Sequence, residues 1–270
     1  MRRGAANAGA VRSMYTPMAG AYEEIWAPLL RPFGLRLIKL LPLLGAGRVL
    51  DLGCGVGRLL PDIEEHVPGA LVVGSDLVEG MVVRAPARFA RVVMDATQLG
   101  FEDHAFDAVV SAFCLFHLPS PIDALTGIGR VLRPSGGIAL AVWGQRAVFS
   151  AAVAWIGELD AAAVPPDPVA EGPVDGEALV NSREKLGSVL AAAGFEDVQC
   201  ESLPWEQPWT PGAFIDWQLR MGPSRRRLDQ LDPPDRDRVV AWASKRVASM
   251  TAEDLVDRKE VVIASGRSPA

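Results

Sequence analysis

The stretch Val-Leu-Asp-Leu-Gly-Cys-Gly-Val-Gly, residues 49–57, determines the fold prediction for this chain. Residues 48–52 have the apolar character of a buried strand, three glycines follow at alternate positions, and residues 58–65 have the pattern of a helix. Glycine permits positive φ and lets a ligand approach the main chain, and the free N–H groups of a helix N-terminus attract electronegative atoms. The stretch therefore predicts a strand, a turn and a helix that bind a nucleotide-like ligand.

The spacing of the glycines separates this turn from the dinucleotide fingerprint G-x-G-x-x-G. The third glycine comes one residue early, and Asp51 precedes the first glycine by two positions. A carboxylate at that point suits a cationic ligand better than a pyrophosphate. The turn resembles motif I of the class I S-adenosylmethionine-dependent methyltransferases, whose cofactor carries an amino acid end and a sulfonium.

Further strands follow the turn, and two of them lead into an acid. Residues 70–76 form an apolar strand that ends in Asp76, where a βαβ unit places a carboxylate against ribose hydroxyls. The alternative is a solvated aspartate at a strand end. Residues 91–94 lead into Asp95, which in the resembling family faces the adenine amino group, although a loop or helix-cap aspartate is the alternative.

Residues 106–114 and 138–143 complete five strands that alternate with helices, a pattern typical of a parallel sheet with right-handed crossovers. The resemblance covers residues 48–144 and the region around residues 193–195, and the ubiquinone/menaquinone C-methyltransferase-like branch has the most similar pattern. It implies an α/β, Rossmann-like, doubly wound seven-strand sheet whose last strand is antiparallel. It also implies S-adenosyl-L-methionine as cofactor, bound by Asp51, Gly53, Cys54, Gly55, Gly57, Asp76, Leu77, Met81, Asp95, Ala96, Ala112 and Phe113.

The 270 residues suffice for one core with insertions, and the net charge of −6 argues against a nucleic-acid substrate. Three unpaired cysteines favour reduced, cytoplasmic thiols, and no apolar run has the length of a membrane span. We expect a helical N-terminal cap (1–46), a cofactor-binding core (47–145), an insertion (146–180), a core helix and strand (181–203), a helical, tryptophan-rich lid insertion (204–257), and a last core strand with a tail (258–270).

Within these segments the local patterns predict individual elements. The N-terminal segment should form two short helices broken near Pro28 and Pro32. A capped helix should begin at Asn181, the sixth strand should cover residues 195–203, and the last strand residues 260–264. The run of arginines at 225–227 has the character of a solvated face.

His117 is the candidate catalytic residue, because it lies just past the end of the fourth strand, where open α/β sheets place their ligands. Many relatives have Leu-His-His here, whereas this chain has Leu-Phe-His and a single imidazole. His117 is either a base for an acceptor whose proton must leave or a structural donor under the substrate loop. His66 and His104 have the character of surface residues, and no spacing suggests a metal site.

The remaining large aromatic side chains are candidates for the acceptor pocket. They come from the N-terminal helices and from the insertion at 204–257. A pocket wall and the insertion's own hydrophobic core are equally good interpretations of the second group. The candidates are Tyr15, Tyr22, Trp26, Trp209, Phe214 and Trp217.

The sequence thus predicts a cytoplasmic bacterial methyltransferase that acts on a small, largely apolar metabolite, such as a natural product or a quinone. Two alternatives belong to other classes. One is a non-methylating S-adenosylmethionine-binding protein that guides another reaction or a partner, and the other is a nicotinamide-dependent oxidoreductase. Neither the acceptor nor the oligomeric state follows from the residues.

Overall fold

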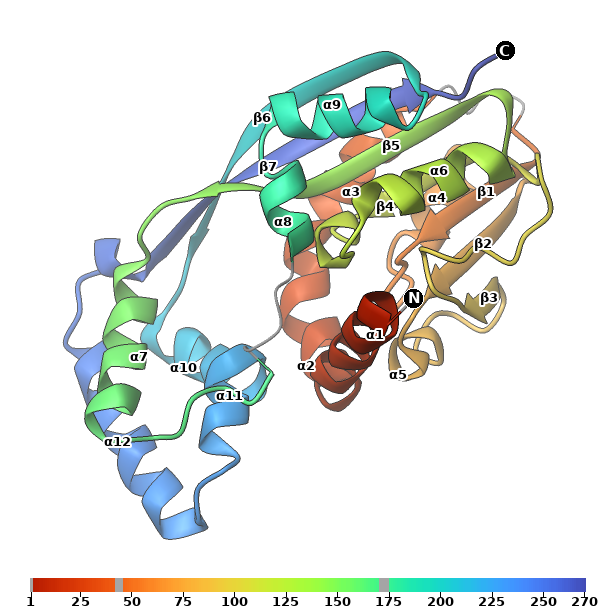
Figure 1. Ribbon diagram of the computed structural model, residues 1–270. Helices are drawn as coiled ribbons and strands as arrows, with labels where there is room; N and C mark the ends of the chain where they lie inside the picture. Colours follow the sequence, from red (N-terminus) through yellow and green to blue (C-terminus); the bar gives the residue numbers. More distant parts are fainter. Residues whose placement is uncertain (1, 42–45, 170–174) are drawn as a thin grey trace. The chain divides into compact units, whose positions relative to one another are not determined.

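A computed structural model describes residues 2–41, 46–169 and 175–270 of the chain (Figure 1). The chain forms two compact units. The first comprises residues 1–145, 174–203 and 261–270, and the second comprises residues 146–173 and 204–260. Strands β6 (Glu196–Pro208) and β7 (Val256–Arg267) each extend from the first unit into the second. Within the described residues, no helix is long and apolar enough to cross a membrane.

The first unit is built on a seven-stranded sheet in the order β3-β2-β1-β4-β5-β7-β6, with the last strand antiparallel, as predicted. Strands β3, β2, β1, β4 and β5 pair in parallel, each with the next in that order. The remaining strands are β1 (Arg48–Leu52), β2 (Leu71–Asp76), β3 (Ala90–Val93), β4 (Phe106–Ala112) and β5 (Leu132–Arg146).

The order of the sheet reverses between strands β1 and β4. Val49 and Leu50 are fully buried, and β1 pairs with β2 on one side and β4 on the other. In open α/β sheets this switch point opens a crevice beyond the carboxyl ends of the strands. The glycine turn follows β1 at this end, so the fold places it where such sheets bind ligands.

Helices cover the sheet of the first unit (Figure 1). They are α1 (Arg2–Tyr15), η1 (Thr16–Met18), α2 (Ala19–Ala21), η2 (Tyr22–Trp26), α3 (Ala27–Leu40), α4 (Leu60–His66), α5 (Glu79–Val82), η3 (Leu115–His117), α6 (Pro121–Val131), α8 (Asp175–Val180) and α9 (Arg183–Ala192).

The predicted helix break near Pro28 and Pro32 is wrong. Pro28 lies in the first turn of α3, where its missing N–H removes no helical hydrogen bond, and Pro32 is accommodated inside the same helix. The irregularity lies earlier, at the π-helical turn η2. Buried side chains of α3, including Leu37 and Ile38, hold the helix in place, so packing overrides the cost of the internal proline.

Several other element boundaries differ from the predictions. The helix after the glycine turn begins at Leu60 rather than residue 58, and α9 is capped by Ser182 rather than Asn181, since the Ser182 hydroxyl accepts the Lys185 N–H. Strands β6 and β7 are longer than predicted because both continue into the second unit. The apolar pattern used for the prediction covers only the parts of these strands that lie in the core of the first unit.

The described residues of the second unit form four α-helices, a short 3₁₀ helix and the outer parts of β6 and β7. Its centre is aromatic: Phe214 and Trp155 are fully buried and meet edge to face with centroids 6.1 Å apart. The helices are α7 (Ser150–Ala161), α10 (Pro211–Arg220), α11 (Gly222–Leu228) and α12 (Pro233–Ala248), with η4 (Glu253–Leu255).

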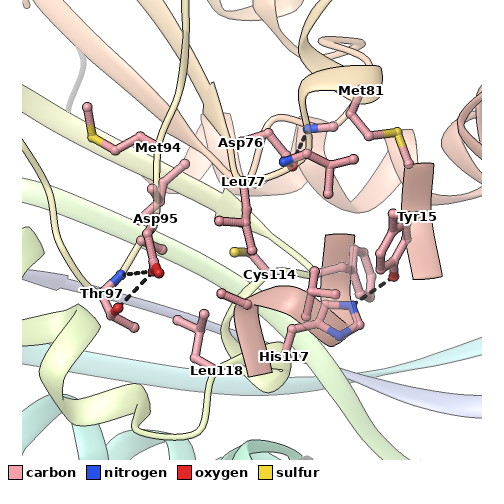
Figure 2. A pocket seen from close by; sticks show the side chains of 18 of the residues that line it. Tyr15, Asp76, Leu77, Met81, Met94, Asp95, Thr97, Cys114, His117 and Leu118 are labelled. Atoms are coloured by element: carbon pink, nitrogen blue, oxygen red, sulfur yellow. Dashed lines mark hydrogen bonds between the residues drawn. The ribbon is translucent and has the colours of Figure 1, made fainter. Parts of the chain in front are cut away.

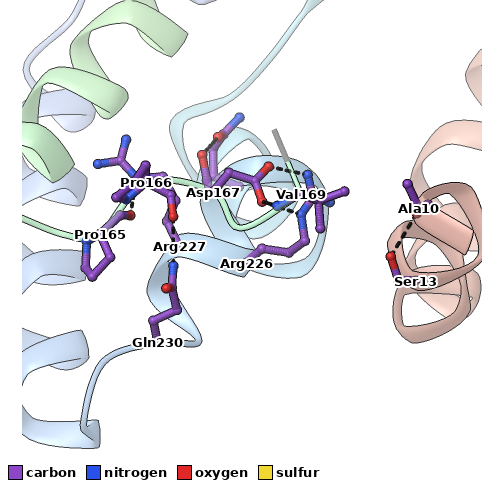
Figure 3. Close-up of polar contacts among 11 residues, drawn as sticks. Ala10, Ser13, Pro165, Pro166, Asp167, Val169, Arg226, Arg227 and Gln230 are labelled. Carbon is purple, nitrogen blue, oxygen red and sulfur yellow. Dashed lines mark hydrogen bonds and ion pairs between the residues drawn. The ribbon is translucent and has the colours of Figure 1, made fainter. Parts of the chain in front are cut away.

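The predicted solvated face at residues 225–227 is wrong for two of its three arginines. Arg226 makes a two-pronged ion pair with the buried carboxylate of Asp167, at 2.8 and 2.5 Å (Figure 3). Arg227 is 8% exposed and donates to the carbonyl oxygens of Val164 and Pro165. Arg227 thus satisfies backbone carbonyl groups of the loop after α7 and Arg226 satisfies its buried acid, so both are part of the structure of this unit.

Candidate cofactor and acceptor site

A cavity of about 830 Å³, counting its open mouth, lies within the first unit beyond the carboxyl ends of the strands (Figure 2). Its walls come from α1, η2, the glycine turn, the ends of β2 and β4, and the segments after β3 and β4. The predicted site residues that line it are Tyr15, Tyr22, Gly53, Gly55, Asp76, Leu77, Met81, Asp95, Ala96, Ala112, Phe113 and His117. Two predicted site residues, Asp51 and Cys54, line a smaller cavity of about 420 Å³ that shares Tyr22 and Gly53 with the first.

The three glycines of the turn have positive φ, but different neighbours require them. A Cβ on Gly53 would lie 2.5 Å from Cys114 Cβ, and one on Gly57 would lie 2.6 Å from Ala85 Cβ. These two positions therefore need glycine for close packing of the protein itself. A Cβ on Gly55 would meet only the Tyr22 ring, at 3.5 Å, so Gly55 is the glycine whose missing side chain leaves space in the site.

Asp51 is a buried carboxylate with an unused acceptor. Its side chain is 1% exposed, and its Oδ2 atom has no hydrogen-bond partner among the described residues. Burial, reinforced by the nearby charge of Asp76, raises the pKa of Asp51 from 3.8 to about 7. Such a group is costly to leave unpaired and gains most from a cationic ligand.

Asp76 ends β2 and faces the larger cavity (Figure 2). Its carboxylate accepts the backbone N–H groups of Gly55 and Val78, both at 2.9 Å. Burial raises its pKa, and these backbone hydrogen bonds oppose the rise. The bond from Gly55 ties the acid to the glycine turn and the bond from Val78 ties it to the start of α5. One carboxylate therefore connects the segments that follow β1 and β2.

The far end of the cavity combines apolar side chains with one acid. Asp95 Oδ1 accepts the Thr97 N–H at 2.9 Å and the Thr97 hydroxyl at 2.7 Å, which holds the loop after β3 in a tight turn (Figure 2). Ala96 is buried next to it in the chain, and Leu77 and Met94 also line the cavity. A flat heterocycle fits this setting, because its faces can pack on apolar groups while its edge meets a fixed acceptor.

His117 and Tyr15 form a pair on the opposite side of the cavity. The distance from the Tyr15 hydroxyl oxygen to His117 Nε2 is 2.8 Å, and the rings meet edge to face with centroids 5.3 Å apart (Figure 2). His117 belongs to η3, directly after β4, and Tyr15 ends α1. The N-terminal helix therefore supplies the partner of the only imidazole in the cavity wall, a pairing that the sequence does not indicate.

The position of η3 depends on a residue that the sequence analysis missed. The backbone of α8 approaches η3 so closely that a Cβ on Gly176 would lie 2.0 Å from the Leu118 carbonyl oxygen and 2.9 Å from that of Phe116. Only glycine fits there without displacing the loop that carries His117. No local pattern distinguishes this glycine from the others in the chain.

Phe113 and Cys114, at the end of β4, also bear on the site. Phe113 has a φ of 57°, which is strained for an aromatic residue, and packs against Trp143 with centroids 4.6 Å apart. Cys114 was not predicted to line the cavity, and burial raises its pKa to about 12. Burial likewise raises the pKa of Cys54. Both thiols therefore stay protonated near neutral pH and are unsuited to act as nucleophiles.

Other predicted site residues lie outside both cavities. Gly57 packs against Ala85, and Trp26 meets Trp143 edge to face. Phe214, Trp209 and Trp217 belong to the second unit, where Trp209 and Trp217 stack with centroids 5.0 Å apart. Their assignment to the acceptor pocket stays a prediction. Among the described residues, no group of three or more histidine, cysteine, aspartate or glutamate side chains is placed to hold a metal ion.

The donors and acceptors of the cavity fit S-adenosylmethionine. The unpaired Oδ2 of Asp51 suits its ammonium group, and two buried carboxylates suit a ligand that carries both an ammonium and a sulfonium. The strand order also differs from the dinucleotide-binding order 3-2-1-4-5-6, because β7 is inserted between β5 and β6. Fold and site together define a class I methyltransferase domain, and S-adenosylmethionine is the cofactor of this class.

Comparison with known proteins confirms the predicted class. Residues 50–140 match the family described as methyltransferase domain. A malonyl-[acyl-carrier protein] O-methyltransferase of Herminiimonas arsenicoxydans is 32% identical over 198 residues, which cover 72% of this chain and 66% of the relative. A ubiquinone/menaquinone biosynthesis C-methyltransferase of Desulfotalea psychrophila is 36% identical over 97 residues, covering 34% and 39%. The chain thus spans less than two thirds of the length of these relatives.

One solved structure extends the likeness beyond the matched domain. A phosphoethanolamine N-methyltransferase of Haemonchus contortus, in complex with phosphomonomethylethanolamine and S-adenosylhomocysteine, has a TM-score of 0.56 at 20% identity. The alignment covers 93% of this chain and 57% of that one. At this identity the likeness shows that the two proteins share a fold.

Proposed function

We propose that this protein transfers the methyl group of S-adenosylmethionine to a small, largely apolar acceptor. The observation that carries the proposal is the buried carboxylate of Asp51, whose Oδ2 lacks a partner beside the glycine turn. An unpaired acid is costly in a binding site unless the ligand is a cation. Relatives that methylate quinone and acyl-carrier-protein substrates support the same reaction class.

In this proposal three acids divide the binding of the cofactor between them. Asp51 receives the ammonium of the methionine end, Asp76 the ribose hydroxyls, and Asp95 the adenine amino group. Asp76 already accepts two backbone N–H groups, which leaves lone pairs on both carboxylate oxygens. Leu77, Met81 and Ala96 enclose the adenine.

The acceptor lies on the side of the cavity lined by Tyr15, His117, Leu118 and Pro119. The cofactor supplies an electrophilic methyl group and leaves as a neutral thioether when the carbon–sulfur bond breaks. Most of the catalysis then comes from alignment of acceptor and methyl group. His117 takes the proton of an acidic acceptor, and the Tyr15 hydroxyl fixes the orientation of its ring.

Quinols and phenolic natural products are the acceptors that this wall favours, because it pairs apolar surface with one base and one hydroxyl. We also propose the cytoplasm as the compartment of the protein, since all three cysteines are free thiols. No nucleic-acid partner is proposed for a chain with a net charge of −6.

The test is methyl transfer from radiolabelled S-adenosylmethionine to a panel of quinols and phenols. We expect His117→Ala to lower kcat by about 10² to 10⁴, the usual contribution of a general base, with cofactor affinity unchanged in calorimetry. Tyr15→Phe is the matched control, since it keeps the ring and removes only the hydrogen bond. It should lower kcat less than His117→Ala does.

The alternative outcomes have separate meanings. Unchanged turnover in His117→Ala would make the histidine structural. Tight cofactor binding without transfer to any acceptor would favour a non-methylating S-adenosylmethionine-binding protein. Failure to bind the cofactor would reject the proposed function itself.

A further inference from the structure

Tyr22 lies where the large and the small cavity meet. It is the only residue of the described N-terminal helices that lines both the large and the small cavity. Its ring lies over the glycine turn, since the Cβ direction of Gly55 points at Tyr22 Cε1, 3.5 Å away, and at the hydroxyl oxygen, 4.0 Å away. The phenol therefore stands at the junction of the two cavities.

The charges around this phenol come from both sides. Burial raises the pKa of Tyr22, and the carboxylates of Asp76 and Asp51 raise it further, in that order. Asp76 faces the large cavity, whereas Asp51 lines the small one. The phenol thus lies between two acids and stays neutral across the physiological pH range.

The chemistry of the cofactor identifies what lies at such a junction. In S-adenosylmethionine the sulfur joins the ribose to the methionine chain. Under the proposed function, Asp76 holds the ribose and Asp51 holds the ammonium of the methionine end. A group between these acids lies over the sulfur atom that carries the transferred methyl.

We propose that Tyr22 covers the sulfonium and makes the site prefer this cation over the neutral thioether product. The electron-rich face of a phenol and the lone pairs of its oxygen both attract a cation and gain little from a neutral sulfur. This inference rests on the proposed function, and it assigns Tyr22 to the cofactor rather than to the acceptor.

The surrounding structure supports this role. Tyr22 opens the π-helical turn η2, a rare element that is frequent at functional sites. Its ring also meets that of Tyr15 edge to face, with centroids 6.0 Å apart, and Tyr15 bonds His117. A continuous row of rings therefore runs from the sulfonium position to the proposed base.

Calorimetry with three ligands tests the proposal: S-adenosylmethionine, S-adenosylhomocysteine and 5′-methylthioadenosine. We expect Tyr22→Leu to weaken S-adenosylmethionine binding about tenfold, as a lost cation–π contact would, and S-adenosylhomocysteine binding less than about twofold. Tyr22→Phe keeps the ring and should lose less than Tyr22→Leu. The affinity for 5′-methylthioadenosine, which is neutral and lacks the amino acid end, should not change.

Trp26→Leu is the control, because it alters the same π-helical turn outside both cavities. It should leave the ratio of the two cofactor affinities unchanged. Equal weakening of both cofactor forms by Tyr22→Leu, or no weakening of either, would overturn the proposal. If the unaltered protein binds neither form, the proposed function fails instead, and the two failures remain distinguishable.

Discussion

Aromatic side chains behave differently in the two units of this protein. In the N-terminal helices, Tyr15 and Tyr22 line a cavity, and the Tyr15 hydroxyl bonds His117. In the second unit, Phe214 and Trp155 are fully buried among other rings and fill the space that they enclose. Tyr15, Tyr22 and Phe214 were all candidates for a pocket wall from the sequence. A tyrosine, however, carries a polar end that favours the boundary of a cavity, whereas phenylalanine favours a filled core.

The same contrast holds for buried charge. In the cofactor site, Asp51 keeps an oxygen without a partner. In the second unit, the carboxylate of Asp167 is also buried, but it accepts two hydrogen bonds from Arg226. Burial by itself would raise the pKa of Asp167, but Arg226 and the Val169 N–H lower it below the usual value. A structural acid is satisfied by its own protein, while a binding acid is left for a ligand.

The strongest test of this contrast removes the centre of the aromatic core. Phe214→Ala should lower the free energy of unfolding of the second unit by about 3 to 5 kcal/mol, the usual cost of truncating a buried phenylalanine. Urea denaturation followed by tryptophan fluorescence measures it. The control is Val153→Ala, at a residue that is 61% exposed on α7, which should change stability by less than about 0.5 kcal/mol. A loss below about 1 kcal/mol for Phe214→Ala would contradict the assignment of this ring to a filled core.

A second test uses two neighbouring arginines. Arg226→Ala leaves the buried carboxylate of Asp167 without its partner and should cost about 3 kcal/mol. Arg225 pairs with Asp229 one helical turn away at the surface, so Arg225→Ala should cost about 0.3 to 0.5 kcal/mol. Thermal unfolding of the two variants under one condition compares them. Equal losses would show that the pair of Arg226 is no more structural than a surface ion pair.

The third test concerns the acid left for a ligand. The pKa of Asp51 is raised above its unfolded value, so its contribution to stability is present below about pH 4 and is lost as the pH rises through about 7. A cationic ligand reverses this preference, because it favours the ionised carboxylate. The affinity for S-adenosylmethionine should therefore rise up to about tenfold per pH unit between pH 5 and 7 and then level off.

Calorimetry across this range measures the effect, and Asp51→Asn provides the comparison. The amide cannot ionise, so the variant should bind more weakly at pH 8 and show a flatter profile, with Asp76 supplying what dependence remains, since burial raises its pKa as well. An unchanged slope in Asp51→Asn would remove Asp51 from the binding of the cation.

Sequence alone was sufficient for the sheet and for the position of the cofactor turn. Residues 48–57 combine an apolar strand with glycines at fixed spacing, and both signals are local. Asp76 and Asp95 follow their strands directly, so the parallel sheet brings them to the same edge as the glycine turn. Local periodicity is enough here because side-chain direction and strand end are set within a few residues.

Tertiary structure decided the rest, because the physical causes lie far apart in the chain. Pro32 stays inside α3 because packing outweighs its local preference, and Arg226 is paired because Asp167 faces it from another segment. Gly176 is required by the backbone of η3, and His117 is oriented by Tyr15, 102 positions away. Such contacts depend on how distant elements meet, which neither composition nor spacing encodes. The sequence determined the fold class, the class of cofactor and the edge of the sheet at which the glycine turn and the acids meet, and the fold determined which side chains line the cavity there.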